Sequence, residues 1–395
     1  MIEINNNSEL KRHYSEIARK FTYAKFISLF LIVLFVLFAF HFYRDDITVE
    51  NFRYMIKYLD FEAPSSTAAV GASAISFDGE ASVGLVLYRN DIALLKRTGL
   101  DLYDITGQKI FSSEYTMNSP TAVRGNKYML VFDVGGTYAA VFNTFSKIWE
   151  TSFEYPIIDA AINDRGDFCI VTSEKGYTSA VYMYNSNFEL VYRWLSGDKY
   201  VIDAAMSDKE SDKLILSTLR AEGGFYTSEM LLLSSASDER VAAVSMYDQM
   251  VMEVSDFSDT VTVLTDESMT FFNTQALEKQ TSYTFARDSL KDFQFNEKYS
   301  VLILSKKIIG SENEIVVYSC DGAYINTFSS QVHITDACLA GDNLYILSSG
   351  ELTVYNLESF EKNVLEVDKH YDRIISDNTT VVMAGANDAV TIKGE

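Results

Sequence analysis

The sequence has 395 residues, of which 48% are hydrophobic and 13% aromatic while only 3 are proline, a composition that excludes an intrinsically disordered chain. Its formal net charge of −22 at pH 7 disfavours nucleic acid and anionic lipid headgroups as partners, because both carry negative charge. The length would allow two or three domains, but one repeated pattern fills most of the chain and predicts a single large domain.

The N-terminal segment predicts a membrane anchor. Residues 1–25 form a polar tail in which basic side chains outnumber acidic ones. Residues 26–43 contain no Asp, Glu, Lys or Arg, and at about 1.5 Å per residue a helix of this length approaches the ~30 Å hydrocarbon core of a bilayer. Bulky residues stand where a signal peptidase would cut, so an uncleaved signal anchor is favoured over a cleavable signal peptide.

Charge sets the expected orientation of this anchor. The basic excess of residues 1–25 contrasts with Asp45, Asp46 and Glu50 just after the apolar segment, so the positive-inside rule places the N-terminus in the cytosol. The sequence thus predicts a single-pass protein of the cell membrane that contacts the lipid bilayer through residues 26–43 and exposes its large domain outside the cell. The tail is expected to be a juxtamembrane helix, and a cytosolic partner site is the alternative.

Residues 44–68 predict a stalk and a linker. Four apolar residues from Val49 to Leu59 recur at helical spacing after Thr48, a candidate N-cap, so a short amphipathic helix is expected over residues 47–61. Its apolar stripe would pack on the domain that follows or lie on the membrane surface.

Residues 69–395 repeat one pattern of short strands. An apolar second strand precedes each copy of a third strand, which ends in an aromatic or aliphatic residue followed by a turn former. The third strand recurs, at intervals of roughly 37 to 49 residues, as LDLYDIT (100–106), YAAVFNT (138–144), AVYMYNS (180–186), EMLLLSS (229–235), SMTFFNT (268–274), EIVVYSC (314–320), ELTVYNL (351–357) and AVTIKGE (389–395). This spacing is typical of the blades of a β-propeller.

The repeat predicts an all-β fold, a single β-propeller of eight blades rather than seven. One four-stranded meander cannot cover its own apolar faces, so the copies must stack in a ring, which also leaves only short, protected edges. The last copy supplies three strands. We expect the early strand at residues 70–77 to supply the fourth, so that the two ends of the chain close the ring.

A carboxylate recurs at the start of the first strand in six copies: Asp159, Asp203, Glu253, Asp292, Asp336 and Asp372. Because innermost strands line the central channel of a propeller, these side chains could form an acidic ring near one mouth and hold a cation or a basic peptide segment. In the alternative interpretation, each carboxylate accepts backbone N–H bonds in the turn between two blades. Isolated pairs such as Asp208 and Glu210 are expected to be solvated turns.

The sequence offers few residues for catalysis. Only His333 and His370 lie within the repeats, and no Gly-rich phosphate loop, HExxH motif or calcium loop is present. We therefore predict no enzyme activity, no metal site and no cofactor. The three cysteines, an odd and widely spaced set, predict buried free thiols, with a bridge between Cys320 and Cys338 as the alternative.

The repeat form, as in LYDITGQKIF (102–111) and VYSCDGAYINTF (317–328), resembles the WD40-like and quinoprotein-like propeller superfamily. The layout of tail, anchor, stalk and propeller looks like that of an uncharacterised family of single-pass membrane-anchored propellers of Gram-positive bacteria. Quinoprotein propellers of this shape carry recurring A-x-D-x-x-T-G-x-x-x-W motifs. Here only Thr106 and Gly107 match that motif, so the resemblance does not imply a quinone cofactor.

These observations together predict a membrane-tethered, extracytoplasmic binding or scaffolding propeller that engages a protein or cell-envelope partner. The alternatives are an envelope polysaccharide lyase or hydrolase, and a sensor that signals through residues 1–25. An enzyme would need a deep pocket with convergent carboxylates, whereas a scaffold would need a broad exposed patch.

Overall fold

The computed structural model describes two separate units, one within residues 1–65 and one within residues 66–395. The described residues are 19, 20, 23, 25–31, 33 and 34 in the first unit, and 74–77 and 82–392 in the second, except 211, 223, 238–239, 258, 307–310 and 378–379. All described residues of the first unit are helical. Among the described residues, no helix is long and apolar enough to cross a bilayer. The predicted anchor lies partly outside the described residues, and the predicted amphipathic helix lies wholly outside them.

The second unit consists of eight four-stranded antiparallel sheets. Blades 1 to 4 are β2 (Ser82–Tyr88), β3 (Asp91–Lys96), β4 (Gly99–Tyr103), β5 (Lys109–Glu114); β6 (Pro120–Arg124), β7 (Met129–Asp133), β8 (Tyr138–Phe142), β9 (Lys147–Ser152); β10 (Ile157–Ile162), β11 (Phe168–Glu174), β12 (Tyr177–Tyr184), β13 (Leu190–Ser196); and β14 (Tyr200–Met206), β15 (Lys213–Glu222), β16 (Phe225–Ser234), β17 (Ala242–Tyr247). Blades 5 to 8 are β18 (Val251–Phe257), β19 (Thr260–Thr265), β20 (Ser268–Asn273), β21 (Lys279–Thr284); β22 (Leu290–Phe295), β23 (Tyr299–Ser305), β24 (Asn313–Ser319), β25 (Tyr324–Ser330); β26 (Asp336–Ala340), β27 (Asn343–Ser348), β28 (Glu351–Asn356), β29 (Lys362–Glu366); and β30 (Arg373–Ser376), β31 (Val381–Ala384), β32 (Asp388–Ile392), β1 (Ala74–Ser76).

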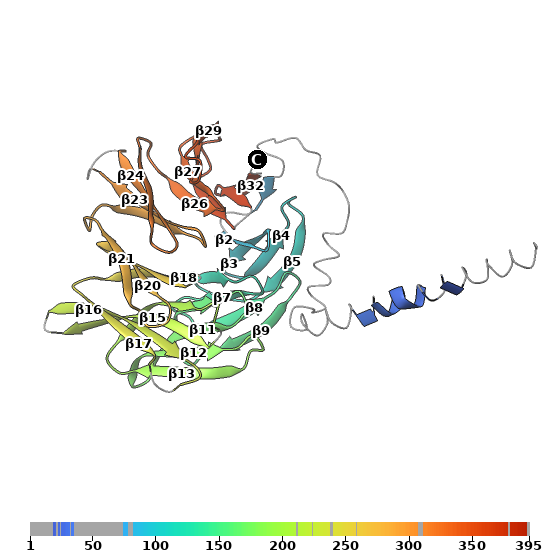
Figure 1. The fold of residues 1–395 in the computed structure, drawn as a ribbon, viewed down its shortest axis with the longest axis horizontal. Helices are drawn as coiled ribbons and strands as arrows, with labels where there is room; N and C mark the ends of the chain where they lie inside the picture. Colours follow the sequence, from blue (N-terminus) through green and yellow to red (C-terminus); the bar gives the residue numbers. More distant parts are fainter. Residues whose placement is uncertain are drawn as a thin grey trace, which may run out of the picture. The chain divides into compact units, whose positions relative to one another are not determined.

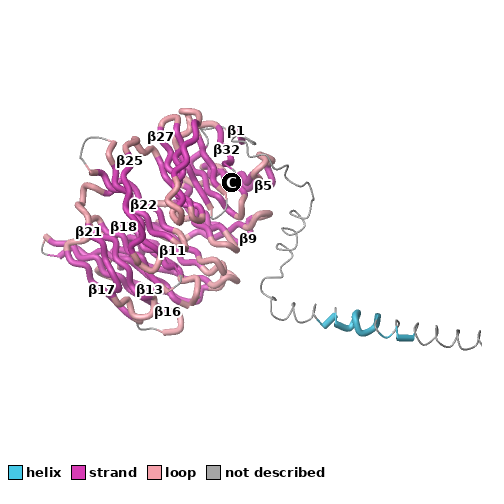
Figure 2. Tube along the Cα trace, turned by 45° about the horizontal axis from the view of Figure 1, so that its top comes forward, coloured by secondary structure: helices cyan, strands magenta, loops and turns pink. Residues whose placement is uncertain are grey.

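The blades follow one another around a ring in chain order, from cyan through green and yellow to red (Figure 1). Short loops join the strands, so strand colour dominates this unit (Figure 2). The prediction of an all-β propeller with eight blades is confirmed.

The position of a strand within its blade explains its residue pattern. In blade 2, all five residues of β7 (MLVFD) are buried, because other strands flank it and neighbouring blades cover both of its faces. The outermost strand of blade 1, β5 (KIFSSE), alternates between exposed and half-buried residues because one of its edges is free. The continuous apolar runs therefore mark central strands, and the alternating runs mark outer ones.

The hydrophobic core lies between blades. Eight clusters of buried apolar side chains are present among the described residues, and each straddles two neighbouring blades. One cluster, for example, joins Val181 of β12 to Leu214 of β15, and both side chains are fully buried. Since each blade completes its core only against its neighbours, the blades depend on one another for stability.

The two ends of the propeller sequence meet in blade 8. Strand β1 pairs antiparallel with β32, with Ala74 opposite Val390, and the Phe77 N–H donates to the Asn387 carbonyl at 2.8 Å. Ile75, 3% exposed, packs in the cluster that joins blade 8 to blade 1. In Figure 1 the red end of the chain lies beside the blue-green strands of its beginning.

Candidate functional site

The eight blades define two faces of the propeller. The first strand of each blade begins at one face, which we call the entry face and which contains Asp203 and Glu253 near the starts of β14 and β18. The same strands end at the opposite face, the exit face, which contains Asp164 and Asp208 in the turns after β10 and β14. Because the chain alternates direction, the hairpins between second and third strands and the links between blades also lie at the entry face.

A central cavity of about 870 Å³ runs between these faces and is lined mainly by first strands of blades 2 to 8. Nine carboxyl side chains line it, against a single guanidinium, that of Arg124. Between its two ends the lining combines small residues such as Ala160, Ala204 and Ala337 with larger apolar ones such as Met206, Phe295 and Ile374. The cavity is therefore acidic at both ends and less polar in the middle.

The structure brings four of the six predicted acids to this cavity: Asp159, Asp203, Glu253 and Asp336. Asp292 lines an adjoining cavity of about 220 Å³, which it shares with Asp336 and His333. The acids of blades 3 to 6 each follow directly on an irregularity in the pairing of the first two strands. In blade 4, for example, Val201 pairs with Thr218 and Asp203 pairs with the next residue, Ser217, so one extra residue lies between them on β14. A β-bulge at this point redirects the side chain.

Asp372 lies apart from these residues. It is exposed, and it precedes β30. Arg373 takes the position that the carboxylates occupy in other blades, since the next residue, Ile374, donates its N–H to Asp336 just as Val254 donates to Asp203. Burial raises the pKa of Asp336, and the backbone N–H groups of Ile374 and Ala337 and the charge of Arg373 partly oppose the shift. In blade 8 a basic side chain thus replaces the recurring acid.

The recurring aspartates join neighbouring blades through the backbone. Asp203 accepts an N–H bond from Ala204 at 2.9 Å and another from Val254 of the next blade at 2.6 Å. Asp336 repeats this arrangement, with a 2.7 Å bond from Ile374 of β30. At Asp203 and Asp336 the carboxylate therefore links two blades, as in the alternative interpretation of the sequence pattern.

Burial and mutual repulsion shift the titration of the entry-end acids. Burial, together with the nearby charges of Glu253 and Asp159, raises the pKa of Asp203 to about 8. Burial and the charge of Asp159 raise the pKa of Glu253 to about 7. Burial also raises the pKa of Asp159 to about 6, although the backbone N–H groups of Ala160 and Ala204 oppose the shift. These three carboxyls therefore remain partly protonated at pH values where exposed carboxyls are ionised.

Two buried carboxylate oxygens of the cavity have no hydrogen-bond partner: Asp159 Oδ2 near the entry end and Asp256 Oδ1 towards the exit end. Asp256 is only 9% exposed, and burial raises its pKa to about 6 although a hydrogen bond from Ser207 opposes the shift. Buried acceptors are rarely left without a partner. Neither oxygen has accessible surface towards the cavity, so their burial is a cost to these two carboxyl groups and does not mark a ligand contact.

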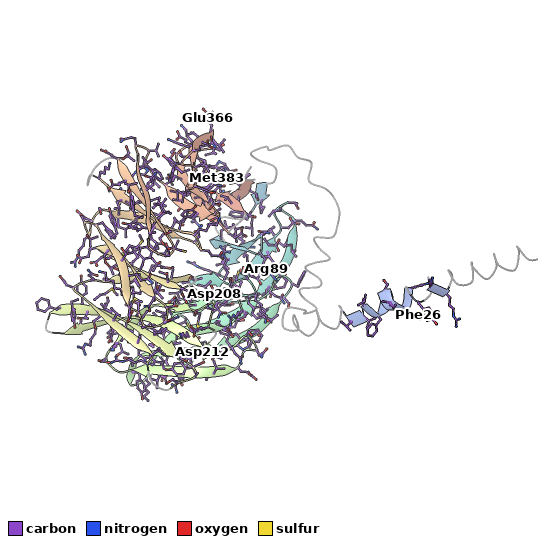
Figure 3. The ribbon with its side chains drawn as sticks, in the orientation of Figure 1. Phe26, Arg89, Asp208, Asp212, Glu366 and Met383 are labelled. Carbon is purple, nitrogen blue, oxygen red and sulfur yellow. The ribbon has the colours of Figure 1, made fainter. Side chains whose placement is uncertain are left out.

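The exit end of the cavity contains side chains that the sequence pattern did not single out for binding. Asp208 is exposed there, as expected of a turn, but it also lines the cavity and accepts the Asp164 N–H at 2.7 Å. Figure 3 labels Asp208 towards the middle of the ring. Arg124 donates to the Ser376 carbonyl at 2.9 Å. The sequence carried one signal for these exit-end acids: an Asp follows directly after Asn163 and directly after Ser207, at the ends of two first strands.

The entry face also carries an arc of exposed apolar side chains over blades 2 to 5, which we call the apolar arc: Val134, Ile158, Tyr177, Tyr200, Phe225, Tyr247, Met250 and Met252. Phe225 and Tyr247 are 74% and 77% exposed. Phe225 begins β16, which forms with β15 a hairpin of two ten-residue strands, and Tyr247 ends β17 of the same sheet. A bridge between Val134 and Ile157 connects blades 2 and 3 within the arc.

Catalytic and metal-binding groups are sparse in the described part of the chain. No three His, Cys, Asp or Glu side chains there converge to hold a metal ion. His370 has both ring nitrogens engaged, by Asp368 at 2.9 Å and Asp388 at 3.0 Å, so neither is available as a general base. Cys169, Cys320 and Cys338 are all free thiols, the first and last buried.

The fold is similar to that of several solved propellers. BamB from Moraxella catarrhalis superposes with a TM-score of 0.54 and 8% identity over 82% of this chain and 97% of that one. The C-terminal WD40 domain of Sif2 gives 0.60 and 9% over 84% and 100%, and the computationally designed protein Ika8 gives 0.59 and 10% over 82% and 100%. At these identities the likeness establishes the fold alone.

The sequence itself matches no curated protein. It does match the profile of one family, described as a family of unknown function (DUF5711), over residues 67–393. This range takes in most of the chain and all the described strands of the propeller, and the chain therefore belongs to the DUF5711 family.

Proposed function

We propose that this protein is a membrane-tethered propeller that binds a partner protein outside the cell through the apolar arc. The exposure of the arc carries the proposal. Aromatic side chains as accessible as Phe225 and Tyr247 are costly to leave in water, and clusters of them mark binding surfaces. Because the arc spans four neighbouring blades of a rigid ring, it offers a broad surface rather than a pocket.

Charge indicates the chemistry of the partner. The entry mouth of the acidic cavity, with Asp159, Asp203 and Glu253, opens on the same face as the arc, and the chain as a whole carries a net charge of −22. A contact surface that combines apolar side chains with basic ones would complement both features. A polymer of the cell envelope is the alternative partner.

The tether rests on the N-terminal segment. Residues 26–43 lack Asp, Glu, Lys and Arg, and basic residues dominate the tail before them. The described apolar side chains of this segment, including Phe26, Phe30, Leu31 and Leu34, are each about half exposed or more. They point to more than one side of the helix, which suits contact with lipid better than packing on a protein core. The layout resembles that of membrane-anchored propellers of Gram-positive bacteria.

Site-specific photocrosslinking in intact cells tests the binding surface. A photoreactive amino acid at Tyr247 or Phe225 should form a discrete adduct with one protein. The same group at Tyr324, which is 60% exposed on β25 away from the arc, should not form that adduct. Absence of an adduct at both arc positions, or the same adduct at all three, would contradict the proposal. If wall hydrolases degrade the adduct and proteases do not, the partner is a polymer of the cell envelope and not a protein.

Protease added to intact cells tests the tether. It should degrade the propeller and leave a protected, membrane-bound fragment that contains residues 1–25. A propeller that becomes accessible only after lysis would place it on the cytosolic side and refute the proposed location.

A further inference from the structure

We propose that strand β1 is a force-sensitive strap, which tension between the membrane and a partner bound at the apolar arc detaches from β32 before any other strand leaves the ring. The proposal rests on the tether and the binding surface proposed above and adds a mechanical response to them. Detachment of β1 would lengthen the link between membrane and partner while the rest of the propeller stays folded.

The place of β1 in the chain is the first observation. The outer strands of blades 1 to 7 each follow the third strand of their own blade, whereas β1 is the first described strand of the propeller and pairs with the last one, β32. Residues 1–73 precede β1 and include the predicted anchor at residues 26–43. Because the chain is continuous, tension on that anchor reaches the propeller through β1.

Strand β1 is also the shortest outer strand among the described residues. It has three residues, whereas the outer strands of the other seven blades have five to seven. Its pairing with β32 begins at Ala74 and ends at Ser76. The Phe77 N–H adds one backbone bond beyond it, to the Asn387 carbonyl. Segments held by few hydrogen bonds and few buried side chains open at a lower free energy than the whole domain.

The apolar cluster that β1 joins is the smallest of the eight in the described part of the chain. This cluster, between blades 8 and 1, contains six buried side chains, two of them alanines. Each of the other seven clusters contains at least seven. Strand β1 contributes Ile75, and Phe77 just after it packs against the cluster while partly buried. The hold of β1 on the core therefore depends mainly on these two side chains.

The seam between blades 8 and 1 depends on β1 at the entry face. Asp203 and Asp336 each accept an N–H from the next blade, but Arg373 takes the equivalent position in blade 8. A guanidinium accepts no hydrogen bond, so Arg373 cannot form the same link to blade 1. Strand β1 pairs with the first half of β32, the half nearer the entry face, and brings Ile75 across the seam there.

Other bonds hold the same seam at the exit face. Asp377, just after β30, accepts the N–H of Asn90 from the turn between β2 and β3 at 3.2 Å. The Thr380 hydroxyl donates to the Asn90 side chain, also at 3.2 Å. None of these three residues belongs to β1. Blades 8 and 1 therefore stay linked at one end when β1 leaves the sheet.

The length of chain that is released sets the size of the mechanical step. Eight residues, 74–81, lie between the start of β1 and the start of β2 at Ser82. At ~3.3 to 3.6 Å per residue they span at most about 29 Å when fully extended. Beyond Ser82 the tension reaches β2, a seven-residue innermost strand that pairs with β3. A small extension should therefore precede the much larger one of the unfolding ring.

Magnetic tweezers on the full chain test the proposal. The protein is held by its own N-terminal segment in a surface-bound nanodisc. It is pulled by a bead attached through an azide-bearing amino acid at position 247, in the apolar arc. We expect a reversible extension of at most about 29 Å at a lower force than the unfolding of the propeller. A single large extension, with no earlier step, would overturn the proposal.

A disulfide isolates the contribution of β1. Ser76→Cys with Asp388→Cys places two cysteines opposite each other. Because Phe77 donates to Asn387 in the adjacent pair, the pair at 76 and 388 makes no backbone hydrogen bonds and its side chains lie close together. With Cys320→Ser to prevent wrong pairing, the oxidised protein should lack the small extension and the reduced protein should show it. Identical traces in the two states would assign the step to another segment and refute the strap.

Failure of the tether and failure of the strap give different results. A chain that the nanodisc does not retain refutes the tether, and the same pull with the N-terminus linked directly to the surface then tests the strap. Hydrogen exchange tests the strap without force. The Phe77 amide should exchange about tenfold or more faster than the amides of the outer strand β13 that pair with β12. Equal or slower exchange would show that β1 is not weakly held.

Discussion

Glu253→Gln should stabilise the propeller, and only at neutral to alkaline pH. Burial and the charge of Asp159 raise the pKa of Glu253 from 4.5 to about 7. Because the folded-state pKa lies above the unfolded one, the folded state loses stability as the pH rises from about 4.5 to about 7, and the full cost is present above that range. At 1.36 kcal/mol per pKa unit the cost of the ionised Glu253 at pH 8 is about 3 kcal/mol. Gln removes this charge and keeps nearly the same volume.

Urea denaturation of the wild type and the variant at pH 5 and at pH 8 measures the effect. We expect the variant to be about 2 to 3 kcal/mol more stable at pH 8 and within about 1 kcal/mol of the wild type at pH 5. Glu366→Gln, an exposed charge on β29, should change stability little at either pH. A stabilisation of the same size at both pH values, or a destabilisation at pH 8, would refute the argument that repulsion and desolvation act on Glu253.

Three further predictions concern ring closure, one histidine and the thiols. Ile75→Asp places a charge in the cluster between blades 8 and 1 and should cost more than about 3 kcal/mol in urea denaturation, while Ile105→Asp at a 38% exposed position should be nearly neutral. Hydrogen bonds that His370 donates to Asp368 and Asp388 raise its pKa, so Asp388→Asn should lower that pKa in an NMR titration, and an unchanged value would contradict the pairing. Cys320, the half-buried thiol, should react with a thiol reagent well before the two buried ones, Cys169 and Cys338.

The overall fold could be predicted because a propeller blade repeats its signals. The third strands recur at nearly even spacing, and their central position favours apolar residues, as at Met230, Leu231, Leu232 and Leu233 of β16. The three-strand final copy predicted a partner strand from the beginning of the propeller, and β1 lies within the predicted segment. Strand β1 spans Ala74–Ser76, and residues 70–73 of the predicted strand lie outside the described residues.

The candidate site could be predicted only in part. The first-strand acids recur in sequence, and the sequence placed them at one end of the first strands. It could not show that a bulge precedes Asp203, or that blade 8 shifts by one residue so that Arg373 and not Asp372 takes the equivalent position. Sequence periodicity also gave no sign of the apolar arc, because Phe225 and Tyr247 lie far apart along the chain and meet on one face only through the hairpin of blade 4.

The most direct test of the account is the affinity of the purified protein for the partner identified by crosslinking at Tyr247. If the apolar arc is the binding surface, Phe225→Ser combined with Tyr247→Ser should weaken binding at least tenfold. The control Tyr324→Ser removes an exposed aromatic side chain on β25, away from the arc, and should leave the affinity unchanged. Equal affinity of all three proteins would contradict the account and move the binding surface away from the entry face.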